Sequence, residues 1–556
     1  IQADGQGDLA QQLWFLEFGQ WAILHGHNPF ITTWINAPNG ANLLGNTGIL
    51  LPSILASPIT LLFGPVAGFN FWMILAFALS AGSMYFAVSH WVAWKPAAYI
   101  AGLVFGFSPF MVGQGLGHLN LLIEPVAPLV LYVAYEMLVG NGNERTRSLG
   151  VILGLLLAAQ FFVSTEILAG IGMMGVFGVF AALIFDRNRV IARARTMTAT
   201  VGWALLTFIV ICFLPLILLF EGADHYVGPA QLGLGQLRSD LFSLIDPTIL
   251  QLIHPGVLTA PYGDVAEAGL YLGLPLLVFL GIAFWKLRSK PVVKGLGALA
   301  VVAWVLTLGP RLTIAEHSTS IPLPFAAIAR LPLMDNLLPS RLSVFVFLFS
   351  APLLALGLDR LHSVIGRNTG SALKAAGIVS AVVALLFIPL IPSWPYGAGN
   401  VTVPSFFTSA AERQIPPGST VITYPFPIGV SALPMTWQAV DAMRYKLVGG
   451  YIITPQADGR ATFYGSVSDI SGLSFYAFNG EQSLPRLKPN VLRGIKLDLE
   501  VYGVDTIIVA NSGHNPGYME RAYAAALKEP GHDYDGTYVW FGVKQRLADL
   551  NVAKRP

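Results

Sequence analysis

About ten hydrophobic segments, each long enough to cross a lipid bilayer as a helix, lie between Leu43 and Ile391. A spanning helix needs about 20 apolar residues because its backbone amides must be bonded internally across about 30 Å of hydrocarbon. Charged residues make up only 11% of the chain, against roughly 25% in a typical soluble domain. The sequence therefore predicts a polytopic α-helical membrane protein with about 10–12 transmembrane helices. The candidate segments are 43–63, 69–93, 97–112, 119–139, 149–164, 167–185, 198–220, 269–285, 295–309, 341–361 and 373–393.

Four short loops between these segments are rich in Lys and Arg, and the positive-inside rule makes such loops cytoplasmic. The longer segments 221–268 and 310–340, and the region after residue 393, then all fall on the opposite face. The basic residues that define the cytoplasmic loops are Arg145, Arg147, Arg187, Arg189, Arg193, Arg195, Lys286, Arg288, Lys290, Lys294, Arg360, Arg367 and Lys374.

The N-terminal quarter contains one apolar run more than this topology allows. Placing residues 1–40 outside requires an odd number of crossings before Arg145, and four apolar runs precede it. The run 43–63 contains two prolines, and the run 97–112 is short with Ser108-Pro109 near its end, so either could fail to cross. Because the chain begins with Ile1 and a polar loop, we also expect one further span upstream.

The composition becomes mixed after residue 393, which predicts a soluble extracytoplasmic α/β domain. Residues 419–424 and 504–510 are typical of buried strands, and 492–502 and 518–527 of helices. We accordingly divide the chain into a first extracytoplasmic loop with an interfacial helix (1–42), a transmembrane domain (43–393) and the α/β domain (394–556). In this last domain, residues 436–438 and 446–451 form either an aromatic and polar surface for sugar rings or part of a small core.

Two carboxylates stand in the first loop immediately before an amphipathic stretch. Asp4 and Asp8 precede residues 9–25, in which apolar and polar side chains alternate as in a helix at the membrane interface. An acid held there could act as a general base on a hydroxyl acceptor or bind a metal ion. Alternatively, the two aspartates are a turn residue and a helix N-cap.

Three arginines are predicted to lie on the outer face, beside the membrane: Arg341, Arg311 and Arg330. Arginine binds phosphate oxygens bidentately and stays charged, so these residues are candidates for holding a lipid phosphate as it departs. The alternative is contact with phospholipid headgroups.

Four further polar residues lie at the outer ends of apolar segments. His118 and Asn120 follow a Gly-Leu-Gly sequence and could orient a substrate or, for His118, bind a metal; a structural hydrogen bond is the alternative. Glu124 and Glu166 lie within or beside apolar runs, where an ionisable group is costly and so indicates function unless it is paired structurally. We predict all four as substrate-binding residues.

Several classes of function have no support in the sequence. The net charge of +2 offers no basic face for nucleic acid. The single Cys212 lies inside an apolar run, so there is no disulfide framework or CxxC metal motif. No Walker loop, dinucleotide-binding GxGxxG or GxSxG elbow is present.

Several short motifs follow one another along the membrane region in a recognisable order. The motifs are Gly7-Asp8, Trp14, Asn28-Pro29-Phe30, Pro38-Asn39-Gly40, Leu62-Phe63-Gly64, Ser108-Pro109-Phe110, Gly117-His118-Leu119-Asn120, Gly150 to Glu166, Tyr271-Leu272-Gly273 and Leu308-Gly309-Pro310 to Pro339-Ser340-Arg341. Their order resembles the bacterial GT-C superfamily, which contains multi-pass glycosyltransferases related to protein O-mannosyltransferases and aminoarabinose transferases. The resemblance covers most of the membrane region. It implies that an acid in the first external loop is the catalytic base, which makes Asp8 the first choice and Asp4 the second, and that the donor is a sugar on a polyprenyl phosphate.

The sequence thus predicts a membrane glycosyltransferase of the bacterial cytoplasmic membrane, with its active site and C-terminal domain outside. Its expected partners are a polyprenyl-phosphate-linked sugar, a glycan, lipid or protein acceptor, and membrane lipids, with a divalent cation such as Mg²⁺ or Mn²⁺ as an optional cofactor. Two alternatives remain open: a lipid-linked glycan flippase, although no inverted repeat is evident, and a non-catalytic assembly protein of the cell envelope.

Overall fold

The computed structural model describes residues 6–140, 145–230, 237–254, 265–331, 334–394, 401–463, 468–481 and 483–552. The chain divides into two compact units. The first unit combines Ile1–Phe71, Leu214–Ala230 and Ala398–Pro556, and the second combines Trp72–Phe213 and Gln231–Gly397. The first loop and the C-terminal region therefore belong to the same unit. The predicted domain boundaries at 42/43 and 393/394 stay predictions.

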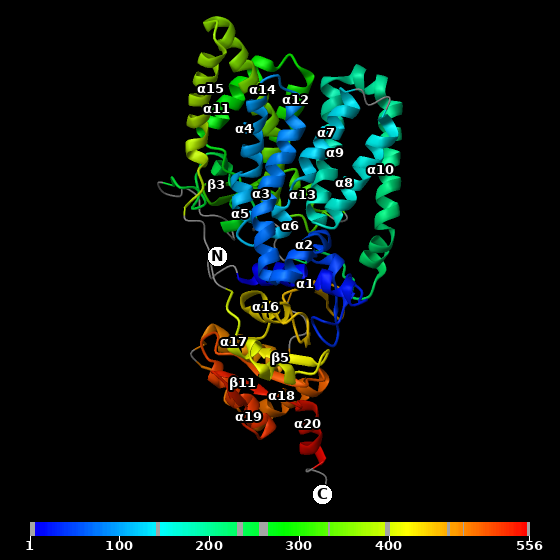
Figure 1. Ribbon diagram of the computed structural model, residues 1–556, viewed down its shortest axis with the longest axis vertical. Coiled ribbons are helices and arrows are strands. Elements are labelled where there is room, and N and C mark those ends of the chain that lie inside the picture. The colour runs from blue at the N-terminus through cyan, green and yellow to red at the C-terminus, as the bar shows by residue number, and fades with distance from the viewer. Residues whose placement is uncertain are drawn as a thin grey trace. The chain divides into compact units, whose positions relative to one another are not determined.

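Apolar helices account for every predicted membrane segment (Figure 1). Among the described residues, seven helical stretches have at least 18 residues and the hydropathy of a membrane span. The stretches are α3 (Pro65–Ser89), α4 (Lys95–Gly106) with α5 (Pro109–Gln114), α6 (Leu119–Leu122) with α7 (Val126–Leu138), α9 (Thr165–Phe185), α10 (Arg187–Glu221), the 3-10 turn η6 (Pro339–Leu342) with α14 (Ser343–Thr369), and α15 (Ala372–Phe387) with the 3-10 turn η7 (Ile388–Leu390). Shorter apolar helices are α2 (Leu50–Phe63), α8 (Thr146–Phe161), α11 (Leu274–Leu287) and α12 (Pro291–Thr307). The prediction of a multi-pass helical membrane protein is confirmed.

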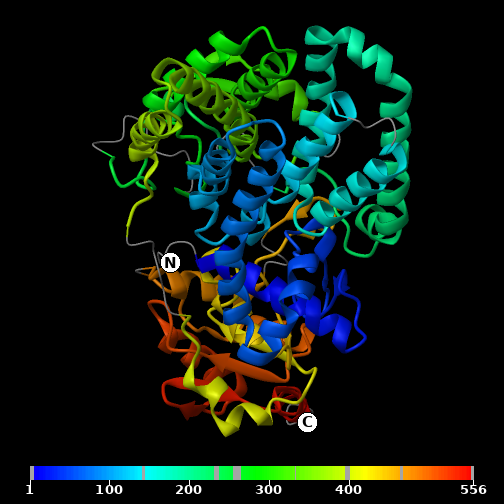
Figure 2. The ribbon, with the colours of Figure 1, turned by 45° about the horizontal axis from the view of Figure 1, so that its top comes forward.

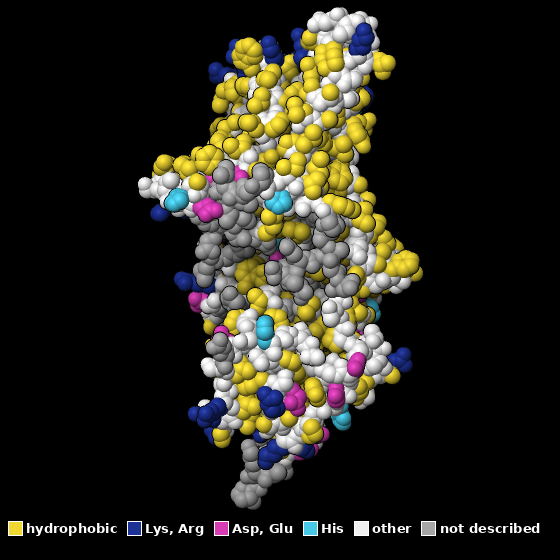
Figure 3. Space-filling view, turned by 90° about the vertical axis from the view of Figure 1, so that its left-hand side faces the viewer, with side chains coloured by type: hydrophobic (Ala, Val, Ile, Leu, Met, Phe, Trp, Pro, Cys, Tyr) yellow, Lys and Arg dark blue, Asp and Glu magenta, His cyan; other side chains and the backbone are white. Residues whose placement is uncertain are grey.

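Helix α14 is the centre of the second unit, where it packs against α4, α11, α12 and α15 (Figure 2). The most apolar part of its stretch is 89% buried, whereas that of α10 is 17% buried. Figure 3 shows hydrophobic side chains spread over the outward surface of the helices and Lys and Arg side chains at their ends. This distribution is expected for helices that expose one side to lipid.

A short antiparallel hairpin, β3 (Arg311–Ile314) and β4 (His317–Pro322), connects α12 to α14 together with α13 (Phe325–Ile328) and the 3-10 turn η6 (Pro339–Leu342). Between α10 and α11 lie two further 3-10 turns, η4 (Leu241–Leu244) and η5 (Val265–Glu267). These connecting segments, rather than the long helices, carry most of the charged groups described below.

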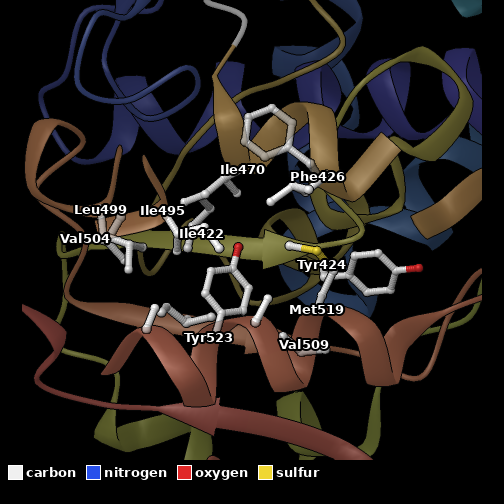
Figure 4. Close-up of a cluster of buried hydrophobic side chains, with 14 of the residues drawn as sticks. Ile422, Tyr424, Phe426, Ile470, Ile495, Leu499, Val504, Val509, Met519 and Tyr523 are labelled. Atoms are coloured by element: carbon white, nitrogen blue, oxygen red, sulfur yellow. The ribbon is translucent and has the colours of Figure 1, made fainter. Parts of the chain in front are cut away.

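The C-terminal region of the first unit contains a five-stranded mixed sheet in the order β10-β11-β9-β5-β6. Strand β5 pairs in parallel with β6 and β9, and β11 is antiparallel to its neighbours. Figure 4 shows Ile422 and Val509 of the sheet packed with Leu499 of α18 and Tyr523 of α19. The predicted α/β region is confirmed. Its main elements are β5 (Thr420–Tyr424), α16 (Leu433–Val440), β6 (Lys446–Leu447), α17 (Asp469–Asn479), α18 (Pro489–Val501), β9 (Thr506–Val509), α19 (Pro516–Leu527), β10 (His532–Tyr534), β11 (Thr537–Trp540) and α20 (Val543–Val552).

Helix α1 (Gln6–Leu24) packs between α2 and α16 within the first unit. Trp14 Nε1 donates to Gln438 Oε1 (2.6 Å), and Gln11 Nε2 donates to the Tyr451 carbonyl (2.5 Å). The chain after α1, which includes β1 (Ile31–Thr32) and β2 (Ala41–Asn42), continues this attachment, because the backbone N–H of Leu447 donates to the Trp34 carbonyl (2.9 Å). The first loop and the C-terminal region therefore lie on one side of any membrane.

One sequence interpretation of this unit is wrong, and one alternative that the sequence left open is decided. Helix α1 exists as predicted, but its polar side chains are buried as well as its apolar ones, so it does not present the exposed polar face of an amphipathic surface helix. Residues 436–438 form part of the core rather than a sugar-binding surface, because Trp437 and Gln438 are at most 1% exposed.

Candidate active site

Arg341 is shared by two carboxylates at the beginning of the central helix α14. Its Nη1 donates to Glu166 Oε2 (2.6 Å), and its Nε donates to Glu267 Oε1 (2.8 Å). Ser340 Oγ also donates to Glu267 Oε2 (2.7 Å), and the Leu338 N–H donates to Glu166 Oε1 (3.0 Å). The guanidinium is therefore held in one orientation, and neither carboxylate contact uses its Nη2 atom.

Each member of this cluster is positioned by the start or end of a short element. Ser164 caps α9, because its side chain accepts from the Ile167 N–H, and Glu166 lies in the first turn that follows. An acid is favourable there because the helix dipole is positive at its N-terminus. Glu267 ends η5, which packs closely on α5. Gly113 of α5 permits this approach, since a Cβ there would lie 2.6 Å from the Ala266 carbonyl oxygen.

Glu267 stays ionised despite being almost completely buried. Burial by itself would raise the pKa of its carboxyl, but the charges of Arg341 and His118 and the hydrogen bond from Ser340 lower the pKa below its ordinary value. Glu166 and Glu267 thus share one guanidinium, that of Arg341.

His118 lies within an interrupted stretch of chain between α4 and α7. The chain leaves the helix at Phe107, forms the short helices α5 and α6, and resumes a long helix only at Val126. Gly117 has a φ of +153°, within the turn that separates α5 from α6. Non-helical backbone at membrane depth is tolerated where protein surrounds it, and most residues of this interruption are buried.

Several polar atoms of this interrupted stretch have no hydrogen-bond partner among the described residues. Both carboxylate oxygens of Glu124 belong to this group, and so does Asn120 Oδ1. Glu124 is 0% exposed. Its backbone N–H does have a partner, because it donates to Ser80 Oγ (3.2 Å). Gln114 donates through Nε2 to the Ala266 carbonyl (3.0 Å), while its Oε1 lacks a partner in the same part of the chain.

The structure thus brings together several residues that the sequence singled out. Arg341 and Glu166 are in direct contact, and the charge of His118 helps to lower the pKa of Glu267, which also contacts Arg341. Asn120 and Glu124 continue the same stretch of chain. Glu267 and Ser340 were missed as individual site residues, because neither carries a distinctive local pattern. The roles of the predicted site residues in binding or catalysis stay predictions.

Arg311 and Arg330 are exposed, on β3 and just after α13. A further arginine that the sequence did not indicate, Arg238, donates through Nε to Thr313 Oγ1 on the same hairpin (2.7 Å). The residue before it, Leu237, accepts through its carbonyl from the Ser340 N–H (3.2 Å). Arg238 therefore connects the hairpin to the segment that carries Arg341.

The predicted catalytic acids belong to the first unit. Asp8 lies in the first turn of α1, inside the helix rather than at its N-cap. Asp4 falls outside the described residues. A second acid of this helix, Glu17, is buried, and its burial raises the pKa of its carboxyl to about 7, although the hydrogen bond from Gln20 Nε2 (3.0 Å) opposes the rise. Glu17 was not among the predicted site residues.

No group of three or more His, Cys, Asp or Glu side chains suited to a metal ion occurs among the described residues. Both carboxylates of the Arg341 cluster are already engaged by the guanidinium. These side chains therefore do not form a cation site by themselves, and we assign no chemical step to a divalent cation.

Comparison with known proteins agrees with this architecture. The family model described as "Domain of unknown function (DUF6311)" matches residues 6–334. No curated protein sequence matches the chain. Among solved structures, arabinofuranosyltransferase AftD from Mycobacteria superposes with a TM-score of 0.56 at 14% identity, over 96% of this chain and 39% of that one. A mutant form of AftD gives 0.51 at 15% identity, over 91% and 36%.

An archaeal oligosaccharyltransferase, AglB from Archaeoglobus fulgidus, was also matched, with a TM-score of 0.46 at 12% identity over 94% of this chain and 67% of that one. The chain spans about two fifths of the length of AftD. The superposition on AftD confirms the predicted GT-C-like fold.

Proposed function

Because the chain belongs to the DUF6311 family and has the fold of GT-C glycosyltransferases, we propose that it transfers a sugar from a polyprenyl-phosphate donor to a hydroxyl acceptor. The observation that carries this proposal is the superposition of 96% of the chain on a membrane arabinofuranosyltransferase. A prenyl tail requires a donor site that opens to lipid, which a multi-pass helical unit can provide. The acceptor is a glycan, lipid or protein outside the cytoplasmic membrane.

In the proposed reaction, the acceptor oxygen attacks the anomeric carbon of the donor sugar. The bond between that carbon and the phosphate oxygen breaks, and the prenyl phosphate leaves with the bonding electrons. Asp8 takes the proton of the acceptor hydroxyl as general base, with Asp4 as the second choice. His118, Asn120, Glu124 and Glu166 bind or position the donor.

Arg341 is the proposed contact for the departing phosphate, through the Nη2 atom that Glu166 and Glu267 leave free of their own contacts. Two carboxylates beside it oppose an anion, however, so Arg341 needs further positive charge. Arg311 and Arg330 are exposed side chains of the same unit and Arg238 is linked to its segment, which makes these arginines the proposed source of that charge. Substituting Arg311 or Arg330 by Ala should therefore weaken donor binding more than it slows the chemical step.

We further propose that α2 is the apolar run that does not cross. It has 14 residues, contains Pro58, and belongs to the same compact unit as α1. The remaining spans then place the arginine-rich loops in the cytoplasm and the first loop and C-terminal region outside. The C-terminal region would hold the acceptor.

A transfer assay tests the proposed function. Purified protein would be supplied with synthetic prenyl-phosphate donors carrying a radiolabelled sugar and with membrane-derived acceptors. We expect label in the acceptor and one prenyl phosphate released per sugar transferred. A flippase would instead move intact donor across proteoliposomes, and an assembly protein would do neither; either result would refute the proposal.

A further inference from the structure

The second unit contains a group of buried hydrogen-bonding side chains that the ion cluster does not use. Glu124 has two carboxylate oxygens without partners among the described residues, and Gln160, also 0% exposed, lacks partners there for both Nε2 and Oε1. Asn120 Oδ1 shares this property. Leaving such groups unpaired in a protein interior costs about 1–3 kcal/mol each, more for a charge. Several together indicate that something else bonds to them.

The packing of α7 against α8 brings Gln160 to the level of Glu124. The two helices form an antiparallel pair, and near their connection Val133 and Met137 of α7 cluster with Leu149 and Leu153 of α8. Met137 follows Val126 by 11 residues along α7, and Gln160 follows Leu149 by 11 residues along α8. Since both helices rise about 1.5 Å per residue, Gln160 lies at about the same level along the helix pair as Val126. Glu124 is two residues before this point.

The chemistry of these groups selects their ligand. The carboxyl oxygens of Glu124 can accept hydrogen bonds, and an amide both donates and accepts. A sugar hydroxyl also donates and accepts, so it can donate to Glu124 while accepting from Gln160. Arg341, by contrast, is suited to bind a phosphate. His118 lies in the same chain segment as Asn120 and Glu124, and its charge also acts on Glu267, which contacts Arg341.

We propose that Glu124, Gln160 and Asn120 form a subsite that binds hydroxyl groups of the donor sugar and determines which sugar is accepted. This inference rests on the proposed function and adds to it the class of sugar: a neutral sugar with free hydroxyls, bound by a buried carboxylate and amides. A sugar that lacks the contacted hydroxyl leaves these buried groups unpaired, which is why such sites discriminate strongly.

Donors that each lack one hydroxyl test the subsite. For one of them, wild-type kcat/KM should fall about 30-fold or more, as expected when a buried hydrogen-bonding group is left unpaired. In Glu124→Gln and in Gln160→Met, removal of the same hydroxyl should lower kcat/KM much less, because the substitution has already weakened the contact that this hydroxyl makes. Glu136→Gln, on the half-buried part of α7, is the matched control and should discriminate like wild type. Equal deoxygenation penalties in wild type and both variants would overturn the inference.

A binding measurement separates failure of the subsite from failure of the proposed function. The stabilisation of purified protein by prenyl-phosphate sugar is compared with that by prenyl phosphate alone, without any transfer. We expect the sugar to add stabilisation in wild type and in Glu136→Gln, and to add markedly less in the two subsite variants. No added stabilisation by the sugar in wild type, or a preference for amino sugars that Glu124→Gln removes, would refute a hydroxyl subsite even if transfer occurs.

Discussion

At the scale of single residues, the shared guanidinium of Arg341 is the feature with the largest energetic consequence. Glu267 is 3% exposed in its side chain and accepts from both Arg341 and Ser340. Removing one partner of a buried ion pair leaves the other charge uncompensated and typically costs 3–5 kcal/mol. The cluster therefore holds the N-terminal ends of α9 and α14 together whatever its role in catalysis.

We predict that Glu267→Gln lowers the free energy of unfolding by about 3 kcal/mol, because the amide keeps the shape but not the charge that Arg341 requires. Thermal unfolding in detergent would measure this. The half-buried Glu136→Gln serves as a control with a change of less than about 1 kcal/mol. Equal melting temperatures for Glu267→Gln and wild type would show that the ion pair is not formed.

Glu17 predicts a pH dependence of stability. Because burial raises its pKa in the folded protein to about 7 from the ordinary 4.5, its contribution to stability is fully present below about pH 4.5 and is lost as the pH rises to about 7. At pH 8, Glu17→Gln should therefore unfold at a higher temperature than wild type, and its free energy of unfolding should be greater by at most about 3 kcal/mol. At pH 4 the two proteins should unfold at similar temperatures. An identical difference at both pH values would contradict the assignment.

Much of the site could be predicted from the sequence, and the missing part has a physical cause. Arg341, Glu166, His118 and Glu124 stand at the ends of apolar segments, where a charged group is expensive enough to be noticed. Glu267 lies in a polar loop in which an acid is unremarkable. Only the tertiary packing of η5 on α5 makes it a buried carboxylate.

At the scale of elements, glycine spacing decides how closely α3 and α4 approach. A Cβ at Gly102 would lie 2.6 Å from the Ala81 carbonyl oxygen, and one at Gly106 would lie 2.6 Å from the Ala81 nitrogen. Small residues four apart allow such close packing of membrane helices. The interrupted stretch that carries His118 begins immediately after Gly106.

Gly106→Ala should therefore destabilise the second unit by about 1–3 kcal/mol, because the backbones of α3 and α4 must separate. Gly82→Ala provides the control, since a Cβ there meets no atom within 4 Å and alanine favours the helix. Their unfolding temperatures in detergent should shift in opposite directions. A Gly106→Ala protein as stable as wild type would show that the two helices tolerate a wider spacing.

The elements themselves were largely predictable, because apolar length and period determine them. Each long apolar run became a helix, and β5, β9, α18 and α19 formed where expected. The environment of α1 was not predictable. Its alternating pattern is typical of a surface helix, but the hydrogen bonds of Gln11 and Trp14 to the C-terminal region bury the polar side too.

At the scale of the whole molecule, the shared compact unit of α1 and the C-terminal region fixes their common side. Cysteine labelling tests the proposed direction, and the single native Cys212 makes a cysteine-free Cys212→Ser background simple to obtain. Suitable exposed positions are Thr33 in the first loop, Ala548 in α20 and Ser148 at the start of α8.

In intact cells, an impermeant maleimide should label Thr33→Cys and Ala548→Cys but not Ser148→Cys, which should react only after lysis. Labelling of Thr33→Cys and Ala548→Cys from opposite sides would contradict the fold. Labelling of Ser148→Cys alone would invert the topology and remove the proposed acceptor site from the outer face.

The most direct test of the central claim is sugar transfer by Asp8→Asn beside wild type, measured with purified protein and a radiolabelled prenyl-phosphate donor. Asparagine keeps the size of the side chain but cannot accept the acceptor proton, so we predict at least a 100-fold loss of transfer with donor binding retained. The exposed Glu481→Gln should transfer like wild type. Full turnover by Asp8→Asn would remove Asp8 as the base, and no transfer by wild type with any prenyl-phosphate sugar would contradict the account as a whole.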